Sequence, residues 1–232
     1  MKRKFYIAYG SNLSTEQMAI RCPDARVVGT AVLEGWQLLF KTCATIERNP
    51  KKRTPVLVWE ISGSDERRLD IYEGFPRFYR KEELEVEVHP LEQGEARKLT
   101  AMVYVMNSGY DDLSPSPTYY RVLKDGYTAF SFPQHVLSQA LVDSIGGPNA
   151  IRFLERNGFQ NPETHRVEPD DYRNILDLDS GLYTGTFEDG RTATILREKG
   201  SGFSIIRPAR KGWFEKADFD ENGGLEGVSY EK

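Results

Sequence analysis

The chain passes from an apolar strand into a small polar loop within one short stretch, Phe5-Tyr6-Ile7-Ala8-Tyr9-Gly10-Ser11-Asn12-Leu13. Aromatic and β-branched residues fit a pleated, covered surface, so residues 5–8 are expected to form a buried strand. Gly10 lets the backbone approach a ligand closely, and the two polar residues after it are expected to cap a helix over residues 15–20. Such a loop can bind a carboxylate or phosphate. The same residues also suit an ordinary strand-to-helix turn.

A second signal lies further along the chain, in Leu69-Asp70-Ile71-Tyr72-Glu73-Gly74. Residues 62–72 have the pattern of a helix, with Ser64 as its expected N-cap. Gly74 should end this helix, which puts Glu73 at the C-terminus, where the macrodipole disfavours a carboxylate. The dipole and the neighbouring aromatic side chains would both raise the pKa of Glu73, which suits a general base or acid. The alternative is a solvated glutamate at a fraying helix end.

Five blocks occur in order along the chain and carry a resemblance to a known family. They are Tyr9-Gly10-Ser11-Asn12-Leu13, Ala44-Thr45-Ile46, Leu69-Asp70-Ile71-Tyr72-Glu73-Gly74, Tyr104-Val105-Met106 and Ser114-Pro115-Ser116-Pro117-Thr118-Tyr119. A motif gains weight when its expected context also appears. On these blocks, roughly residues 4–145 resemble the γ-glutamylcyclotransferase family with its AIG2-like members. These enzymes cyclise a γ-glutamyl group to 5-oxoproline and release the attached amine or amino acid.

The resemblance implies roles for the matched residues. Glu73 is implied to be the catalytic general base and acid, and the substrate-binding residues are implied to be Tyr9, Gly10, Ser11, Asn12, Leu13 and Tyr104. In this reaction the substrate's own α-amine is the nucleophile, so the enzyme removes its proton, stabilises an oxyanion and protonates the departing nitrogen. Amine and carbonyl belong to one molecule, so their proximity is built in. The reaction needs no protein nucleophile, metal or cofactor.

The periodicity along the chain indicates an α+β fold. Strands are expected over residues 26–33, 36–40, 56–61, 82–89 and 100–106, and helices over residues 119–129, 133–145 and 149–156. Periodicity alone gives no more than this fold class. The resemblance implies a small, closed, mixed α/β barrel of the γ-glutamylcyclotransferase-like type, with the site in its mouth.

The C-terminal part lies outside the resemblance. Residues 182–187, 192–196 and 203–206 read as a three-strand β meander. We therefore expect a γ-glutamylcyclotransferase-like domain over residues 1–145, a helical connector over 146–176 and a small C-terminal β module over 177–232. So short a module has little core of its own, so it should dock on the barrel or on another subunit, which leaves a homodimer open. It would restrict substrate access or only add stability.

Composition excludes several classes of function. The chain has 232 residues, 39% of them hydrophobic, and a formal net charge of −4. Its short basic runs are scattered and balanced by 35 acidic residues, so no nucleic-acid partner is expected. No apolar run approaches the ~20 residues that cross a bilayer, so no membrane partner is expected. The first strand begins near the N-terminus without a signal-peptide pattern, which predicts a cytoplasmic location.

Cysteine and histidine are sparse. The two cysteines, Cys22 and Cys43, are too few for a disulfide framework and read as small buried hydrophobic residues. The three histidines are far apart and show no metal-ligand spacing, so no metal site is expected. A catalytic triad built on Cys22 or Ser11 is not excluded by the sequence, although nothing marks a base for it.

The leaving group stays open. The stretch Phe75-Pro76-Arg77-Phe78-Tyr79-Arg80 resembles the branch of the family that acts on γ-glutamylamines, whereas residues 114–117 resemble the branch that acts on γ-glutamyl amino acids. The aromatic residues would either wall the pocket or pack in the core. Arg77 and Arg80 would either pair an acidic leaving group or lie as surface charges.

Two classes of function follow. The leading one is an acyltransferase or lyase that performs intramolecular aminolysis on a small γ-glutamyl metabolite, with glutathione metabolism as its setting. The alternative is a non-catalytic γ-glutamyl-binding or protein-interaction module of the same fold, which fold-level analogy does not separate from an enzyme. Within the enzyme class, a γ-glutamyl group carried by a protein or a biosynthetic intermediate is a further option.

Overall fold

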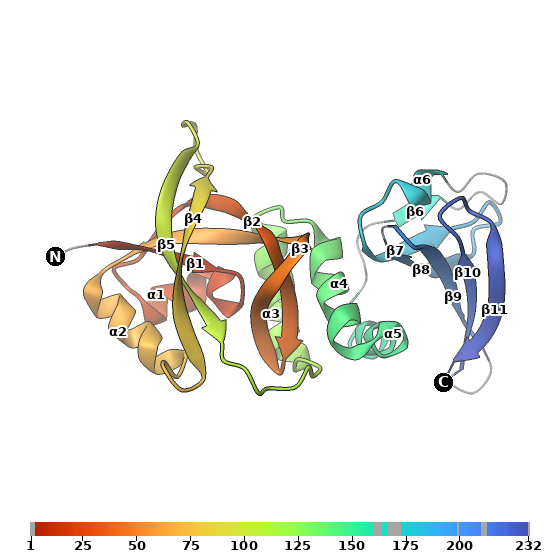
Figure 1. Ribbon diagram of the computed structural model, residues 1–232, viewed down its shortest axis with the longest axis horizontal. Helices are drawn as coiled ribbons and strands as arrows, with labels where there is room; N and C mark the ends of the chain where they lie inside the picture. The colour runs from red at the N-terminus through yellow and green to blue at the C-terminus, as the bar shows by residue number, and fades with distance from the viewer. Residues whose placement is uncertain (1–2, 160–163, 167–172, 199, 210–212, 232) are drawn as a thin grey trace. The chain divides into compact units, whose positions relative to one another are not determined.

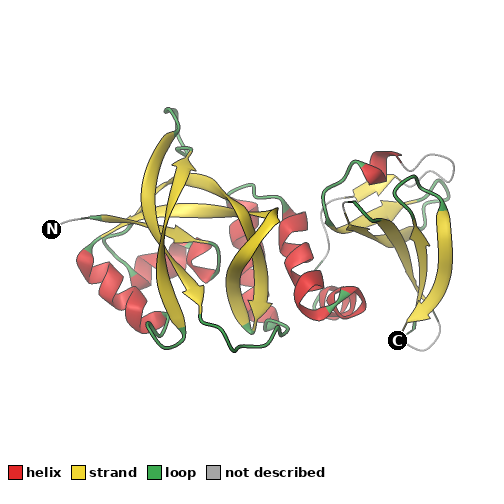
Figure 2. Cartoon of the chain, viewed as in Figure 1, coloured by secondary structure: helices red, strands yellow, loops and turns green. Residues whose placement is uncertain are grey.

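A computed structural model describes residues 3–159, 164–166, 173–198, 200–209 and 213–231. The chain divides into two compact units, Met1–Pro133 and Gln134–Lys232. Figure 1 labels the helices and strands of each unit, and Figure 2 colours them by type.

The first unit is built on a five-stranded sheet in the order β2-β3-β1-β5-β4. Its strands are β1 (Lys4–Ala8), β2 (Arg26–Lys41), β3 (Cys43–Ile61), β4 (Tyr79–Val88) and β5 (Arg97–Met106). The central strand β1 pairs antiparallel with β3 and parallel with β5. The two outer strands also meet, because Thr30 and His89 exchange backbone hydrogen bonds of 2.9 and 2.8 Å. This bridge closes the sheet into a small mixed barrel.

β2 and β3 form one long hairpin, which differs from the sequence prediction. The prediction placed two separate strands over residues 26–33 and 36–40. Instead β2 is continuous, and its register against β3 shifts between Val27 and Gly29 and between Glu34 and Trp36. Such bulges bend a strand without ending it.

Three α-helices and one short 3₁₀ turn accompany this sheet: η1 (Ser11–Leu13), α1 (Thr15–Arg21), α2 (Gly63–Tyr72) and α3 (Pro117–Ala129). Two predicted caps are wrong. The N-cap of α1 is Ser14, because residues 11–13 form the separate turn η1. The N-cap of α2 is Ser62, whose hydroxyl accepts from the N–H of Asp65 while the Asp65 carboxylate accepts from the N–H of Ser62. That reciprocal capping box outcompetes a cap at Ser64.

The second unit joins helices to a second sheet. Its helices are α4 (Gln134–Ile145), α5 (Gly147–Arg156) and α6 (Arg173–Leu176), and its strands are β6 (Thr164–Arg166), β7 (Gly181–Thr186), β8 (Thr192–Glu198), β9 (Gly202–Pro208), β10 (Phe214–Phe219) and β11 (Leu225–Glu231). The strand order is β11-β10-β9-β8-β7-β6, antiparallel except between β6 and β7. The expected meander is β7 to β9. None of the helices in the described part of the chain is both long and apolar enough to span a bilayer.

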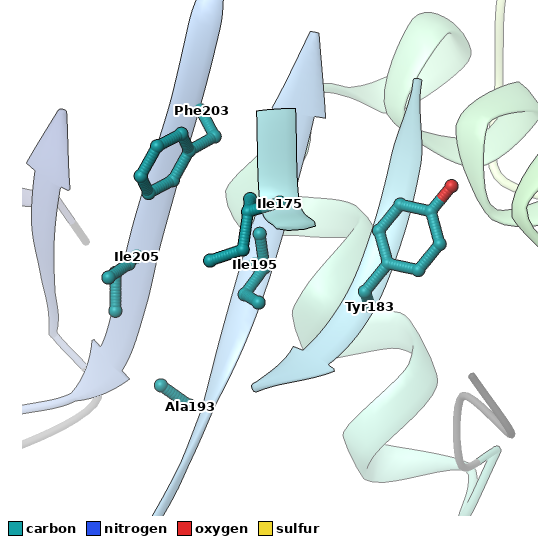
Figure 3. Packing of buried hydrophobic residues seen from close by; sticks show 6 residues of the cluster. All are labelled: Ile175, Tyr183, Ala193, Ile195, Phe203 and Ile205. Atoms are coloured by element: carbon teal, nitrogen blue, oxygen red, sulfur yellow. The ribbon is translucent and has the colours of Figure 1, made fainter. Parts of the chain in front are cut away.

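One face of the second sheet carries an apolar core of its own, shown in Figure 3. Its buried side chains are Ile175, Tyr183, Ala193, Ile195, Phe203 and Ile205. Ile175 comes from α6, so the helical segment before the meander contributes to this core. The second unit therefore has more core than residues 177–232 would supply by themselves.

α4 belongs with this second sheet. The Ser138 hydroxyl accepts a 3.1 Å hydrogen bond from the N–H of Leu182 in β7. The unit boundary in the structure thus lies before α4, whereas the sequence prediction placed it after residue 145. The difference arises because the apolar spacing of α4 predicts a packed helix without saying which sheet it packs on. The predicted boundaries as functional domains stay predictions.

Candidate active site

A small pocket lies where β1 ends. Its lining comes from β1 and the loop after it, from η1, from the strands β3, β4 and β5, from the C-cap of α2 and from the start of α3: Tyr6, Tyr9, Gly10, Ser11, Asn12, Ala44, Glu73, Tyr79, Tyr104 and Tyr119. Glu73, Tyr104 and residues 9–12 are thus brought together as predicted. Leu13 does not line the pocket; it is buried and faces Gly126 of α3. A Cβ added at Gly126 would lie 2.7 Å from the Leu13 Cβ, so only glycine allows α3 to approach the site loop, residues 9–13, this closely.

Glu73 lies at the C-terminal cap of α2, as its place before Gly74 predicts. Its N–H donates to the carbonyl of Leu69 at 2.8 Å, and Gly74 ends the helix with a left-handed φ of 64°. The side chain points into the pocket lining, where the Asn12 Nδ2 donates to Glu73 Oε1 at 2.9 Å. Burial raises the pKa of Glu73 to about 7, against the opposing effects of the Asn12 hydrogen bond and the Arg21 charge. Near neutral pH the carboxyl can therefore both accept and return a proton.

Three pocket tyrosines have their hydroxyl protons committed to the protein. Tyr9 donates to the carbonyl of Tyr104 at 2.6 Å, and Tyr79 donates to the carbonyl of Ala44 at 2.8 Å. Tyr104 donates to Asp70 Oδ1 at 2.6 Å. A phenol has one proton, so these three hydroxyls shape the pocket and offer a ligand only their lone pairs.

Two other tyrosines accept rather than donate. The Tyr6 hydroxyl accepts from Asn12 Nδ2 at 2.7 Å, and the Tyr119 hydroxyl accepts from the N–H of Ala44 at 3.1 Å. Burial raises the pKa of both phenols well above the ordinary value, so both are neutral at pH 7. These bonds do not use the two phenolic protons, which makes Tyr6 and Tyr119 the lining tyrosines suited to donate to a ligand.

The profile of the family described as "Gamma-glutamyl cyclotransferase, AIG2-like" matches residues 6–126. The chain belongs to this family. The matched range contains both the site loop and Glu73. It also contains nearly all of the five-stranded sheet of the first unit.

Curated relatives and solved structures agree with this assignment. A mouse protein named gamma-glutamylcyclotransferase is 30% identical over 142 residues, which cover 56% of this chain and 72% of that protein. A human protein of the same name is 31% identical over 131 residues, 51% of this chain and 66% of that protein. A solved structure titled gamma-glutamyl cyclotransferase aligns with a TM-score of 0.51 at 24% identity, covering 75% of this chain and 98% of that one. The α+β fold of the family is thereby confirmed, with the second sheet as an addition.

Four lining residues lie outside the predicted catalytic and substrate-binding set: Tyr6, Ala44, Tyr79 and Tyr119. For Tyr79 the sequence leaves a pocket wall and core packing both open. Ala44 and Tyr119 lie inside two of the matched family blocks, which was the available signal. Tyr6 reads in sequence as part of a buried strand, and nothing local distinguishes it from core. Tyr79 lines the pocket, whereas Phe75 of the same aromatic stretch is 39% exposed. Aromatic spacing alone does not separate these two fates.

The remaining candidates show no catalytic arrangement. Arg77 is exposed, and Arg80 pairs with Glu82 at 2.7 Å and donates to the carbonyl of Met106. Burial raises the pKa of the Cys22 thiol to about 12, which leaves it an unreactive thiol at neutral pH. Ser11 contacts Arg21 and Tyr72, and neither is a suitable base for a serine nucleophile. Within the described residues, no three His, Cys, Asp or Glu side chains are grouped to hold a metal ion.

Proposed function

We propose that this protein is a γ-glutamylcyclotransferase-type enzyme, which cyclises a γ-glutamyl group to 5-oxoproline and releases an amino acid or amine. The observation that carries the proposal is the half-buried Glu73 carboxyl beside the site loop, with its pKa raised to about 7. The names of the relatives support the reaction class. A small γ-glutamyl metabolite is the proposed substrate; the homodimer, the absence of nucleic-acid partners and the cytoplasmic location stay predictions.

Glu73 acts twice in the proposed reaction. Its carboxylate first removes a proton from the substrate's α-ammonium group, and the freed amine attacks the γ-carbonyl carbon. A carbon–nitrogen bond forms, and the carbonyl oxygen becomes an oxyanion. When the intermediate collapses, the bond to the departing nitrogen breaks and Glu73 returns its proton to that nitrogen. The ring nitrogen gives up its second proton to the released amine, which leaves as an ammonium group, so the ring amide is neutral and Glu73 is again a carboxylate. A pKa near 7 suits both transfers, because neither protonation state is strongly favoured at neutral pH.

The hydroxyls of Tyr6 and Tyr119 are the proposed donors to the oxyanion. Each holds a phenolic proton that its own protein hydrogen bond does not use. Donors fixed in advance stabilise developing charge without reorganising during the reaction. The committed hydroxyls of Tyr9, Tyr79 and Tyr104 would serve instead to fix the shape of the pocket.

Replacing Glu73 with glutamine is the first test. Purified protein is incubated with a panel of γ-glutamyl amino acids and γ-glutamylamines, and 5-oxoproline is quantified by mass spectrometry. We expect turnover of one class by the wild type and loss of at least ~10²-fold in Glu73→Gln, because the amide cannot accept the proton. Glu66→Gln is the matched control: it lies on the same helix, pairs with Lys4 and Lys81, and is not a lining residue.

The same panel separates the alternatives. Turnover retained by Glu73→Gln would contradict the proposed mechanism. A folded wild type that binds γ-glutamyl compounds but forms no 5-oxoproline would support the non-catalytic binding module. Absence of both binding and turnover would direct the search to a γ-glutamyl group on a macromolecule.

A further inference from the structure

Arg21, the last residue of α1, joins three parts of the first unit. Its Nη1 donates to Asn12 Oδ1 at 2.6 Å and to Ser11 Oγ at 3.2 Å, and its Nη2 donates to Gln17 Oε1 at 2.6 Å. The guanidinium also lies over the Tyr72 ring, 3.8 Å from the centroid. A single side chain therefore ties α1 to the site loop and to the last turn of α2, directly before Glu73.

This contact decides which way the Asn12 amide faces. A guanidinium only donates hydrogen bonds, so the side-chain oxygen of Asn12 must face Arg21. The amide nitrogen then faces the other way, and its two hydrogens reach Tyr6 and Glu73 at 2.7 and 2.9 Å. If the amide rotated by half a turn, an oxygen would meet the Glu73 carboxylate and a nitrogen would meet the guanidinium. Both of those contacts are unfavourable.

We propose that Arg21 is a positioning residue for Glu73, acting through the Asn12 amide and through its own positive charge. Arg21 contacts the lining residues Ser11 and Asn12 but does not itself line the pocket, so it is not a catalytic residue. Its orienting effect on Asn12 also leaves the Tyr6 hydroxyl as an acceptor, with its proton free for the substrate. A role for Arg21 in catalysis rests on the proposed function. Its effect on the orientation and the pKa of Glu73 does not.

The charges that face Glu73 support this assignment. The phenols that interact electrostatically with it are Tyr6, Tyr9, Tyr79, Tyr104 and Tyr119, and the thiols are Cys22 and Cys43. Burial raises the pKa of all seven, so they are neutral near pH 7. Arg21 is the cation that lowers the pKa of Glu73, and it works against burial. Removing this cation should raise that pKa further.

A direct titration tests the proposal without needing turnover. Protein labelled with ¹³C in the glutamate side-chain carboxyl is titrated by NMR, and the Glu73 resonance is assigned from its absence in Glu73→Gln. In Arg21→Met we expect the pKa of Glu73 to rise by about one unit, the lower end of the effect of a nearby opposite charge. Arg21→Lys keeps the charge and should recover most of that shift. Arg48→Met, which removes an arginine stacked on Trp36 outside the pocket, should leave the pKa unchanged.

Kinetics give the second readout. If the enzyme turns over a γ-glutamyl substrate, the acid limb of kcat/KM should move to higher pH in Arg21→Met by the same amount as the titration. Arg21→Lys should return the acid limb to its wild-type pH but should not restore the full kcat. A lysine ammonium lacks the planar guanidinium geometry that lets Arg21 donate to Asn12 and Gln17 at the same time. A merely structural role would lower kcat without moving the limb.

The outcomes are distinguishable. A Glu73 pKa that is the same in folded Arg21→Met and in the wild type would overturn the proposal, whatever the activity. If no variant turns over a substrate but the expected pKa shift is observed, the proposed function is contradicted and the positioning role is supported. If Arg21→Met does not fold, Arg21→Gln takes its place, since glutamine is neutral but still offers a donor to Asn12.

Discussion

Tyr119 and Tyr79 are both pocket tyrosines bonded to the backbone of Ala44, yet one hydroxyl accepts and the other donates. Tyr119→Phe removes the proton that we assign to the oxyanion, so we expect kcat to fall by about 10²-fold. Tyr79→Phe removes a proton already committed to a carbonyl, so its kcat should fall less than tenfold. Steady-state kinetics on a substrate from the panel measure both effects. Equal losses in the two variants would contradict the assignment of donors.

At this scale the sequence predicted part of the site. Glu73 was predictable in part because a carboxylate at a helix C-terminus opposes the macrodipole, whereas the site loop alone reads as an ordinary turn and its role followed from the family resemblance. Arg21 and Tyr6 were not predicted, and for Tyr79 a pocket wall and core packing were both open, because these roles depend on which atoms the side chains meet across the fold. An arginine in the last turn of a helix is an ordinary complement to the dipole and gives no further signal.

Among the elements, α2 matters most for the site because it carries Glu73 at its end. Ser62→Ala removes the N-cap hydroxyl, so we expect the free energy of unfolding to fall by about 1 kcal/mol. Ser64→Ala is the matched control: it removes a hydroxyl from the same turn without removing the cap, and should cost less than about 0.5 kcal/mol. Denaturant unfolding followed by circular dichroism compares the two. A larger loss in Ser64→Ala would place the cap at Ser64, as the sequence predicted.

The missed elements share a physical cause. β10 and β11 were not predicted, since their segments mix charged and apolar residues and the side chains of β11 are largely exposed. A two-residue period marks a strand only when one of its faces is buried. The long hairpin of β2 and β3 was only partly predicted, because a bulge and a turn have the same local composition.

Across the whole molecule, the raised pKa of Glu73 should make stability depend on pH. The folded protein keeps the Glu73 proton up to about pH 7, whereas the unfolded chain releases it near its ordinary value of 4.5. Stability contributed by this group is therefore present below pH 4.5 and is lost as the pH rises to 7, by up to about 3 kcal/mol. Glu73→Gln removes this dependence.

Thermal unfolding of both proteins from pH 4.5 to 8 measures the effect. Other groups act in the opposite direction: Lys4 and Lys81 lower the pKa of Glu66, so its contribution is lost as the pH falls. The difference between wild type and Glu73→Gln isolates Glu73, because both proteins contain those other groups. A difference that stays constant with pH would mean that the Glu73 pKa is ordinary.

The existence of a second module was predictable, but its extent was not. Alternating segments near residues 182–206 indicated strands, and the small size of that region indicated that it needed additional core. The structure supplies that core from α6 and places α4 against β7. Apolar spacing on a helix shows that one face is buried but does not show which sheet that face packs against. The boundary between the two units could therefore be found only from the structure.

Trp59 has a consequence for observing the protein at work. Its indole N–H donates to the carbonyl of Asn12 at 3.1 Å, so the ring is hydrogen-bonded to the same residue that contacts Glu73 and Arg21. Of the other two tryptophans, Trp36 stacks with Arg48 and Trp213 is 41% exposed. Trp59 thus gives the site an intrinsic fluorophore. Its emission can follow the arrival of a ligand in real time, without a dye or a chromogenic substrate.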